Sequence, residues 1–174
     1  MKLVVNKAAV LGAGVMGAQI AAHLANANVP VVLFDLPAKE GDKNGIVKKA
    51  LDGLKRMQPS PLVTRDKLQY IDAANYEEHL ELLSGCDLVI EAIAERMDWK
   101  NDLYSRIAPF LPSTAVIASN TSGLSINALA DGLPEALRPN FCGIHFFNPP
   151  RYMPLVEIIA TRSTDPSTLD NLET

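Results

Sequence analysis

A histidine and a glutamate flank a proline-rich segment late in the chain. The segment HFFNPPRYMPLVE runs from His145 to Glu157, with a strand-like stretch on each side of its prolines. Glu157 has apolar neighbours, where an unpaired carboxylate would be costly, so we expect it to pair with His145 across the turn. Such a pair holds the imidazole in one tautomer and raises its proton affinity, as a general base for an alcohol requires. The alternative is a glutamate that faces solvent and a histidine that lies in the core with its hydrogen bonds satisfied there.

A second chemical signal lies near the N-terminus, where the motif GAGVMG occupies residues 12–17. An apolar run of strand length, residues 7–11, precedes it, and residues 16–26 have helix-forming composition. A second apolar strand, residues 31–34, then ends in Asp35, roughly 20 residues beyond the glycines. This order predicts a βαβ unit that binds a dinucleotide. The alternative is a glycine turn that binds nothing.

Each glycine of the motif has a separate physical task. We expect Gly12 to permit a tight turn, Gly14 to let the backbone approach a pyrophosphate, and Gly17 to let the helix pack on its strand. The helix N-terminus would face the phosphates. Asp35 would accept hydrogen bonds from the adenosine ribose and repel a 2′-phosphate, which favours NAD over NADP. The expected cofactor contacts of this turn are Gly12, Gly14, Val15, Met16 and Gly17.

Composition narrows the class of protein without indicating a reaction. A chain of 174 residues with 48% hydrophobic residues supports one domain with a real core. A net charge of −4 argues against nucleic-acid binding. We see no signal peptide, no stretch of membrane-spanning length and no spacing typical of a metal site. Cys86 and Cys142 are isolated, and we expect buried, reduced thiols in a cytoplasmic protein.

Strand-like and helix-like segments alternate along the rest of the chain. This alternation predicts an α/β fold of the Rossmann type, a doubly wound and mainly parallel sheet with flanking helices. We expect Ser125 to cap the N-terminus of a short helix. The further expected helices are 43–57, 76–83, 98–110 and 126–130, and the further expected strands are 68–71, 87–92, 115–119, 141–147 and 155–159.

Polar residues follow two of the expected strands. Ligands in open α/β sheets bind outside the carboxyl ends of strands, and Glu91 and Glu95 follow one strand while the run ASNTS, residues 118–122, contains the end of the next. We expect cofactor or substrate contacts there, although this run could also simply form a turn. Lys100 could reach the same crevice, with an ordinary surface lysine as the alternative.

A basic cluster lies in the expected helix 43–57. Lys48 and Lys55 share one helix face, and Lys49 and Arg56 share another. These side chains could bind phosphates of a nucleotide-like substrate. A solvated helix face is the more common explanation of such a cluster.

Taken together, these motifs resemble the NAD-binding domain of L-3-hydroxyacyl-CoA dehydrogenases over nearly the whole chain. The resemblance implies NAD-dependent oxidation of an L-3-hydroxyacyl-CoA to the 3-ketoacyl-CoA, as in fatty-acid β-oxidation. It also implies that His145 is the catalytic base, that Glu157 is its partner, and that Ser122 and Asn148 hold the substrate oxygen and the histidine. The segments that carry the resemblance are GAGVMG with Asp35, EAIAE at 91–95, SNTS at 119–122, GIHFFNP at 143–149 and LVEII at 155–159.

By the same resemblance, Asp35, Glu95, Lys100, Asn120 and Ser122 would contact the cofactor, with Lys100, Ser122 and Asn148 also near the acyl-CoA. The serine and lysine that the family uses on the helix after the ribose acid have no clean match. Lys49 and Arg56 are the possible substitutes.

The family continues beyond such a domain into a helical domain that completes the acyl pocket and usually forms the dimer. We therefore expect residues 1–174 to be the NAD-binding domain of a longer protein, either a homodimer or a multifunctional enzyme with a hydratase region. The ending STDPSTLDNLET resembles the start of a helix. The alternatives are a crystallin-like gulonate dehydrogenase and a non-catalytic dinucleotide-binding module.

Overall fold

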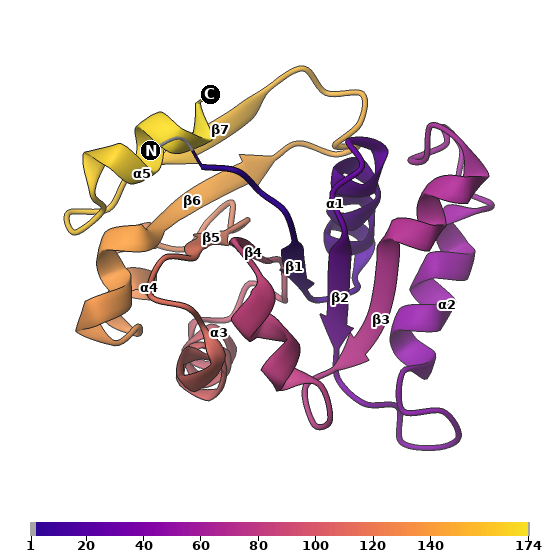
Figure 1. Cartoon of the computed structure of the whole chain (residues 1–174), viewed down its shortest axis with the longest axis horizontal. Coiled ribbons are helices and arrows are strands. Elements are labelled where there is room, and N and C mark those ends of the chain that lie inside the picture. Colours follow the sequence, from indigo (N-terminus) through magenta and orange to yellow (C-terminus); the bar gives the residue numbers. More distant parts are fainter. Residues whose placement is uncertain (1–2, 174) are drawn as a thin grey trace.

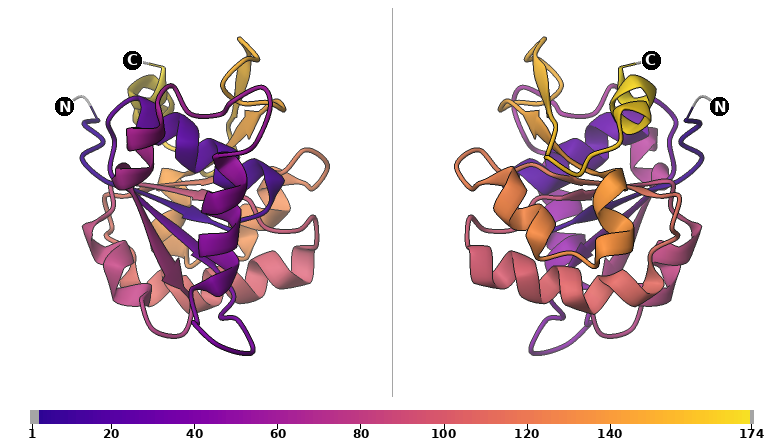
Figure 2. Two further views of the ribbon diagram at one scale, coloured as in Figure 1. Left: turned by 90° about the vertical axis from the view of Figure 1, so that its right-hand side faces the viewer. Right: turned by 90° about the vertical axis from the view of Figure 1, so that its left-hand side faces the viewer.

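The computed structural model describes residues 3–173 and contains one seven-stranded sheet with helices on both faces (Figures 1 and 2). The strand order is β3-β2-β1-β4-β5-β6-β7, and every neighbouring pair is parallel except β6 with β7. The Rossmann-type fold predicted from the sequence is confirmed. The strands are β1 (Ala8–Leu11), β2 (Val31–Asp35), β3 (Ile71–Asn75), β4 (Leu88–Glu91), β5 (Val116–Ser119), β6 (Phe141–Phe146) and β7 (Val156–Ile159). The α-helices are α1 (Val15–Asn26), α2 (Gly45–Leu54), α3 (Met97–Ile107), α4 (Ile126–Asp131) and α5 (Pro166–Leu172).

The central strands are apolar because both of their faces are covered. Ala8 and Val10 of β1 pack in a core with α1 and α2, whereas Ala9 and Leu11 pack in a second core with α3 and α4 on the other face. Alternate residues of a strand point to opposite faces, so a strand buried on both sides reads as a continuous apolar run. The short runs in the sequence therefore marked these strands correctly.

Two of the expected elements are placed wrongly. The strand expected at 68–71 is Ile71–Asn75, because Arg65–Tyr70 forms a 3₁₀ helix before it. The helix expected at 76–83 is a turn followed by a 3₁₀ helix, Leu80–Gly85. The cause is Asn75, whose side-chain oxygen accepts from the N–H groups of Glu77 and Glu78 at 3.0 and 2.9 Å. This local side-chain bond competes with helix formation.

Other boundaries differ less. The basic helix is shorter than expected and ends at Leu54, so Arg56 lies beyond it. Ser125 caps α4 as predicted, with its Oγ accepting from the N–H of Ala128 at 3.3 Å. The expected helix start near the end of the described chain is α5, which Asp165 caps through the N–H of Ser167.

The two cysteines are buried, as predicted. Burial raises the pKa of Cys86 to about 11 and that of Cys142 to about 12. Because the reactive species is the thiolate, both thiols are inert at neutral pH in the folded protein.

In the hairpin of β6 and β7, the segment that connects the two strands reaches one end of α1 (Figure 1). Phe146 of β6 packs edge-on against His23 of α1, with ring centroids 6.3 Å apart. Beyond β6, Arg151 donates to the carbonyl oxygens of Ser60 and Leu62 at 2.7 and 2.8 Å, in the loop after α2. The hairpin is therefore fixed to the same helix that begins at the glycine turn.

Candidate functional site

The first glycine of the motif is required by the backbone. Gly12 follows β1 with a φ of +101°, and a Cβ there would lie 2.8 Å from the carbonyl oxygen of Ala92. Its N–H donates to the carbonyl oxygen of Phe34 at 2.8 Å, which ties the turn to β2. Only glycine adopts this left-handed conformation without strain.

The other two glycines differ in what surrounds them. A Cβ on Gly17 would lie 1.8 Å from the carbonyl oxygen of Gly12, so this glycine allows α1 to pack against the turn. A Cβ on Gly14 would meet no atom within 4 Å. No side chain within the described residues caps α1, and the uncapped N–H groups of a helix N-terminus suit a phosphate. The open space at Gly14 therefore fits a bound pyrophosphate.

This contrast gives a paired prediction. Gly17→Ala should destabilise the fold by about 1–3 kcal/mol, because the new methyl group overlaps the backbone. Gly14→Ala should leave the melting temperature unchanged but weaken NADH binding about tenfold or more, equivalent to at least one hydrogen bond to phosphate. Thermal unfolding and quenching of Trp99, the one tryptophan of the chain, would measure the two effects. A Gly14→Ala protein with unchanged NADH affinity would contradict the assigned position of the pyrophosphate.

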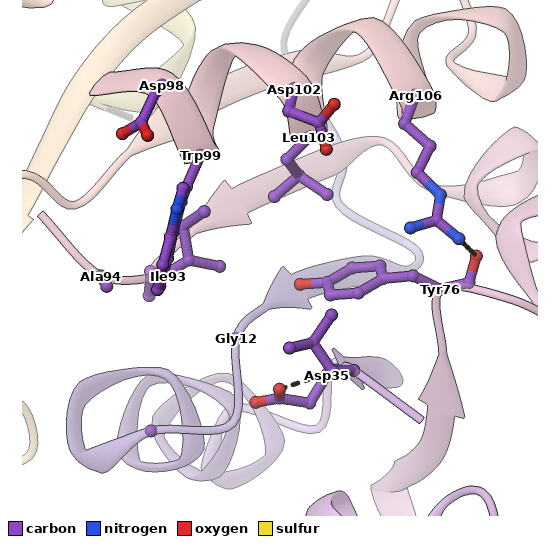
Figure 3. Close-up of a pocket in the computed structure, with 13 residues that line it drawn as sticks. Gly12, Asp35, Tyr76, Ile93, Ala94, Asp98, Trp99, Asp102, Leu103 and Arg106 are labelled. Atoms are coloured by element: carbon purple, nitrogen blue, oxygen red, sulfur yellow. Dashed lines mark hydrogen bonds between the residues drawn. The ribbon is translucent and has the colours of Figure 1, made fainter. Parts of the chain in front are cut away.

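Asp35 ends β2 beside the same turn. Its carboxylate accepts from the N–H groups of Ala13 and Leu36 at 2.6 and 2.7 Å. It also lines a cavity of about 670 Å³ together with Gly12 and Gly14. The structure thus brings the glycine turn and the predicted acid to one cavity (Figure 3).

One wall of this cavity comes from α3 and was missed by sequence reasoning. Trp99, Leu103 and Arg106 recur at helical spacing and face the cavity across from Asp35 (Figure 3). The exposed ring of Trp99 also stacks with the guanidinium of Arg96, 4.6 Å from the ring centroid. The spacing of these residues on the helix after β4 was the signal that could have found them.

Tyr76 forms another part of this cavity that the sequence did not indicate. Its hydroxyl is buried and has no hydrogen-bond partner within the described residues, and the neighbouring N–H of Gly12 is already used by Phe34. Burial, together with the charges of Asp35 and Glu91, raises the pKa of Tyr76 well above its usual value. The phenol is therefore neutral.

The loops after β4 and β5 are tied together. Glu95 accepts from the hydroxyl of Thr121 at 2.5 Å and from the N–H of Ser122 at 2.8 Å. Partial burial alone would raise the pKa of Glu95, but these hydrogen bonds and the charge of Lys100 outweigh it and lower the pKa. Asn120 accepts from the N–H of Phe146 at 2.9 Å, which connects this cluster to the strand that carries the histidine.

Lys100 lies inside the protein. Its side chain is 1% exposed, and its amino group is 2.5 Å from a carboxylate oxygen of Glu91. Glu91 also accepts from the hydroxyls of Tyr104 and Ser119 at 3.1 and 2.7 Å. The ammonium is therefore buried and paired with Glu91 within the fold.

His145 and Glu157 face each other across the β6–β7 ladder. They are register partners, and Nδ1 of His145 is 2.8 Å from Oε2 of Glu157. The predicted pair therefore exists, but the expected burial of Glu157 is wrong, since its side chain is 49% exposed. Glu157 lies in the edge strand β7, where Val156 is also exposed, as is Leu155 just before the strand. The histidine itself is 17% exposed.

The remaining expected site residues lie on the hairpin and on α2. Asn148 accepts from the side-chain amide of Gln19 in α1 at 3.2 Å. Lys48 and Lys55 form ion pairs with Asp42 and Asp52. Lys49 is exposed and has no ion-pair partner within the described residues, and Arg56 lies just before the loop that Arg151 anchors to the hairpin.

Among the residues that the structure describes, no group of three or more histidine, cysteine and acidic side chains is arranged to hold a metal ion. Within residues 3–173, no helix has both the length and the apolar character needed to cross a bilayer.

Comparisons with known proteins agree with this geometry. The family model described as "3-hydroxyacyl-CoA dehydrogenase, NAD binding domain" matches residues 7–174. A Deinococcus radiodurans protein named "Probable 3-hydroxyacyl-CoA dehydrogenase" is 43% identical over 164 residues, which cover 93% of this chain and 47% of that protein. A Rickettsia felis protein named as a fatty acid oxidation complex trifunctional enzyme is 47% identical over 156 residues, which cover 89% of this chain and 22% of that protein.

A solved structure shows the same fold. The crystal structure of 3-hydroxybutyryl-CoA dehydrogenase from Escherichia coli superposes with a TM-score of 0.83 at 30% identity, covering 98% of this chain and 35% of that chain. The chain thus spans 47% and 22% of the two curated relatives above.

Proposed function

The chain belongs to the 3-hydroxyacyl-CoA dehydrogenase family as its NAD-binding domain, and on this premise we propose that it serves the oxidation of an L-3-hydroxyacyl-CoA to the 3-ketoacyl-CoA. NAD, when bound at the glycine turn and Asp35, would supply the acceptor for the hydride from carbon 3. The observation that carries the proposal is the 2.8 Å contact between His145 and Glu157 at the carboxyl end of β6. In an open parallel sheet this edge is where ligands bind.

In the proposed reaction, His145 is the general base. Glu157 engages Nδ1, so Nε2 is the nitrogen left for the substrate. Nε2 takes the hydroxyl proton as the hydride departs, and the carboxylate of Glu157 stabilises the resulting imidazolium. Ser122 and Asn148 orient the substrate oxygen and the histidine.

Other residues serve the ligands in this proposal. Val15 and Met16, in the first turn of α1, adjoin the cofactor phosphates, and Glu95, Asn120 and Ser122 lie on loops tied to each other and to β6. We assign Lys100 an indirect role, since its pairing with Glu91 supports the start of α3.

The CoA phosphates are assigned to the basic residues of the α2 region. Lys49 is exposed on the surface, and Arg56 lies near the loop that contacts the hairpin through Arg151. We further propose a longer, multifunctional protein of fatty-acid β-oxidation, which the trifunctional name of the Rickettsia felis relative supports. The alternative that we propose is a longer protein that forms a homodimer.

The direct test is NADH oxidation driven by acetoacetyl-CoA, compared with NAD reduction by L-gulonate. The proposal expects activity with acetoacetyl-CoA alone. Activity with gulonate would favour the crystallin-like dehydrogenase, and NADH binding with neither activity in a form as long as the relatives would indicate a non-catalytic module.

Asp35 should make the chain selective for NAD. A 2′-phosphate placed against a carboxylate is disfavoured by several kcal/mol, so NADH should bind at least about tenfold more tightly than NADPH. Titration calorimetry of both cofactors would measure this. Asp35→Asn retains an oxygen for the N–H of Ala13 and should narrow the difference. Equal affinities in the unmodified chain would remove Asp35 from the ribose site.

A further inference from the structure

Gln19 connects the cofactor helix to the hairpin that carries His145. It lies in the second turn of α1 and is 4% exposed. Its side-chain nitrogen Nε2 lies 3.0 Å from the carbonyl oxygen of Val15 and 3.2 Å from Oδ1 of Asn148. Nothing in the proposed reaction yet uses this residue.

These two contacts fix the orientation of both amides. The carbonyl of Val15 can only accept a hydrogen bond, so the atom of Gln19 that faces it must be the nitrogen. The same nitrogen faces Asn148, which must therefore present its oxygen. The Nδ2 group of Asn148, with its two N–H donors, is then directed away from Gln19. Asn148 is exposed, so these donors are accessible to a ligand.

We propose that Gln19 is a positioning residue that locks Asn148 as a hydrogen-bond donor toward the oxygen on carbon 3 of the substrate. The inference rests on the proposed function, which places Asn148 beside that oxygen. Negative charge develops on the oxygen as its proton leaves for His145, and a preoriented donor stabilises such charge. An amide turned the other way would present an oxygen to it and oppose the reaction.

The donor character of Gln19 can be tested with near-isosteric substitutions. A carboxylate in Gln19→Glu cannot donate to Oδ1, so it would draw the Nδ2 group of Asn148 toward itself. Gln19→Met keeps the shape but leaves Asn148 free to rotate. His23→Gln is the matched control, because His23 lies one turn further along α1 and contacts the same hairpin through the ring of Phe146, whereas Gln19 contacts Asn148.

We expect acetoacetyl-CoA reduction, measured with the enzyme at micromolar concentration, to fall about tenfold to a hundredfold in Gln19→Glu, in the range of a lost or misdirected oxyanion donor. Gln19→Met should lose less, and His23→Gln should stay within about twofold. NADH affinity, followed by Trp99 fluorescence, should be nearly unchanged in all three.

The pH profile separates positioning from a merely structural role. Burial raises the pKa of a carboxyl group, and the carboxyl group introduced by Gln19→Glu could, once protonated, again donate to Asn148. The loss of acetoacetyl-CoA reduction in Gln19→Glu, relative to the unmodified protein, should therefore shrink as the pH falls. The comparison is made in the reduction direction, where protonated His145 is the active form. A deficit that is constant with pH, or equal losses in Gln19→Met and His23→Gln, would overturn the inference. If the unmodified protein, in the chain and in a form as long as the relatives, showed no acetoacetyl-CoA reduction, the proposed function would fail first.

Discussion

Turnover should fall by about 10²–10⁴ when His145 is replaced by alanine, the usual contribution of a general acid–base group. Nδ1 of the imidazole contacts Glu157, so Nε2 remains available to a substrate hydroxyl. Without it, the proton must leave to water while the hydride departs. NADH binding should change little, because the glycine turn and Asp35 lie on other elements.

Glu157→Gln should lower turnover toward the smaller end of the same range, about 10². The amide can still contact Nδ1, but it carries no charge to stabilise the imidazolium. The carboxylate is 49% exposed, so water screens part of its electrostatic effect.

Both variants are best assayed with acetoacetyl-CoA in a form of the protein as long as its relatives, where turnover is high enough to follow large losses. His79→Gln is a suitable control, since His79 accepts from the N–H of Asn75 in the turn after β3 and is assigned no chemistry. Near-normal turnover of His145→Ala would show that another group takes the proton.

The sequence predicted best those features that depend on local pattern. Short stretches of sequence were enough to predict three such features. These are the glycine turn, the buried strands β1, β2, β4 and β5, and the Ser125 cap. The pairing of His145 with Glu157 was also predictable from the sequence. The chain turns back between the two strands, which makes these residues partners in the β6–β7 ladder.

Features that depend on packing between distant elements could not be read in this way. The sequence pattern around Glu157 indicated burial, but β7 lies at the edge of the sheet, and edge position is a property of strand order. The sequence indicated a surface or site position for Lys100. Its burial against Glu91 depends on how α3 packs beside β4, which the sequence pattern does not show. The contact between Gln19 and Asn148 joins residues 129 positions apart and is visible only once the hairpin lies on α1.

The 174-residue chain by itself should fold and bind NADH but turn over acetoacetyl-CoA at least about 100-fold more slowly than its longer relatives, because loss of substrate positioning can remove several kcal/mol of transition-state stabilisation. The elements needed for NADH are all present: the turn at Gly12, the open space at Gly14, and Asp35 beside the cavity.

The hairpin that carries His145 would leave the acyl substrate exposed to solvent on one side. The cavity lies between Asp35 and α3, whereas the hairpin beyond His145 leaves Tyr152, Leu155 and Val156 exposed to solvent. A thioester bound there would be open to water on that side. Its carbon 3 would sample many positions relative to the nicotinamide, even with every catalytic side chain intact.

The comparison should use matched lengths. The Deinococcus radiodurans relative, of which this chain spans 47%, can be assayed whole and cut at the position that corresponds to Thr174, beside the present chain. NADH affinity should be similar in all three proteins, which would show that the cofactor site is intact in each. Turnover should be high only in the whole relative. Comparable turnover in the cut forms would mean that the hairpin and the glycine turn alone position the substrate, and that the region beyond them serves another purpose.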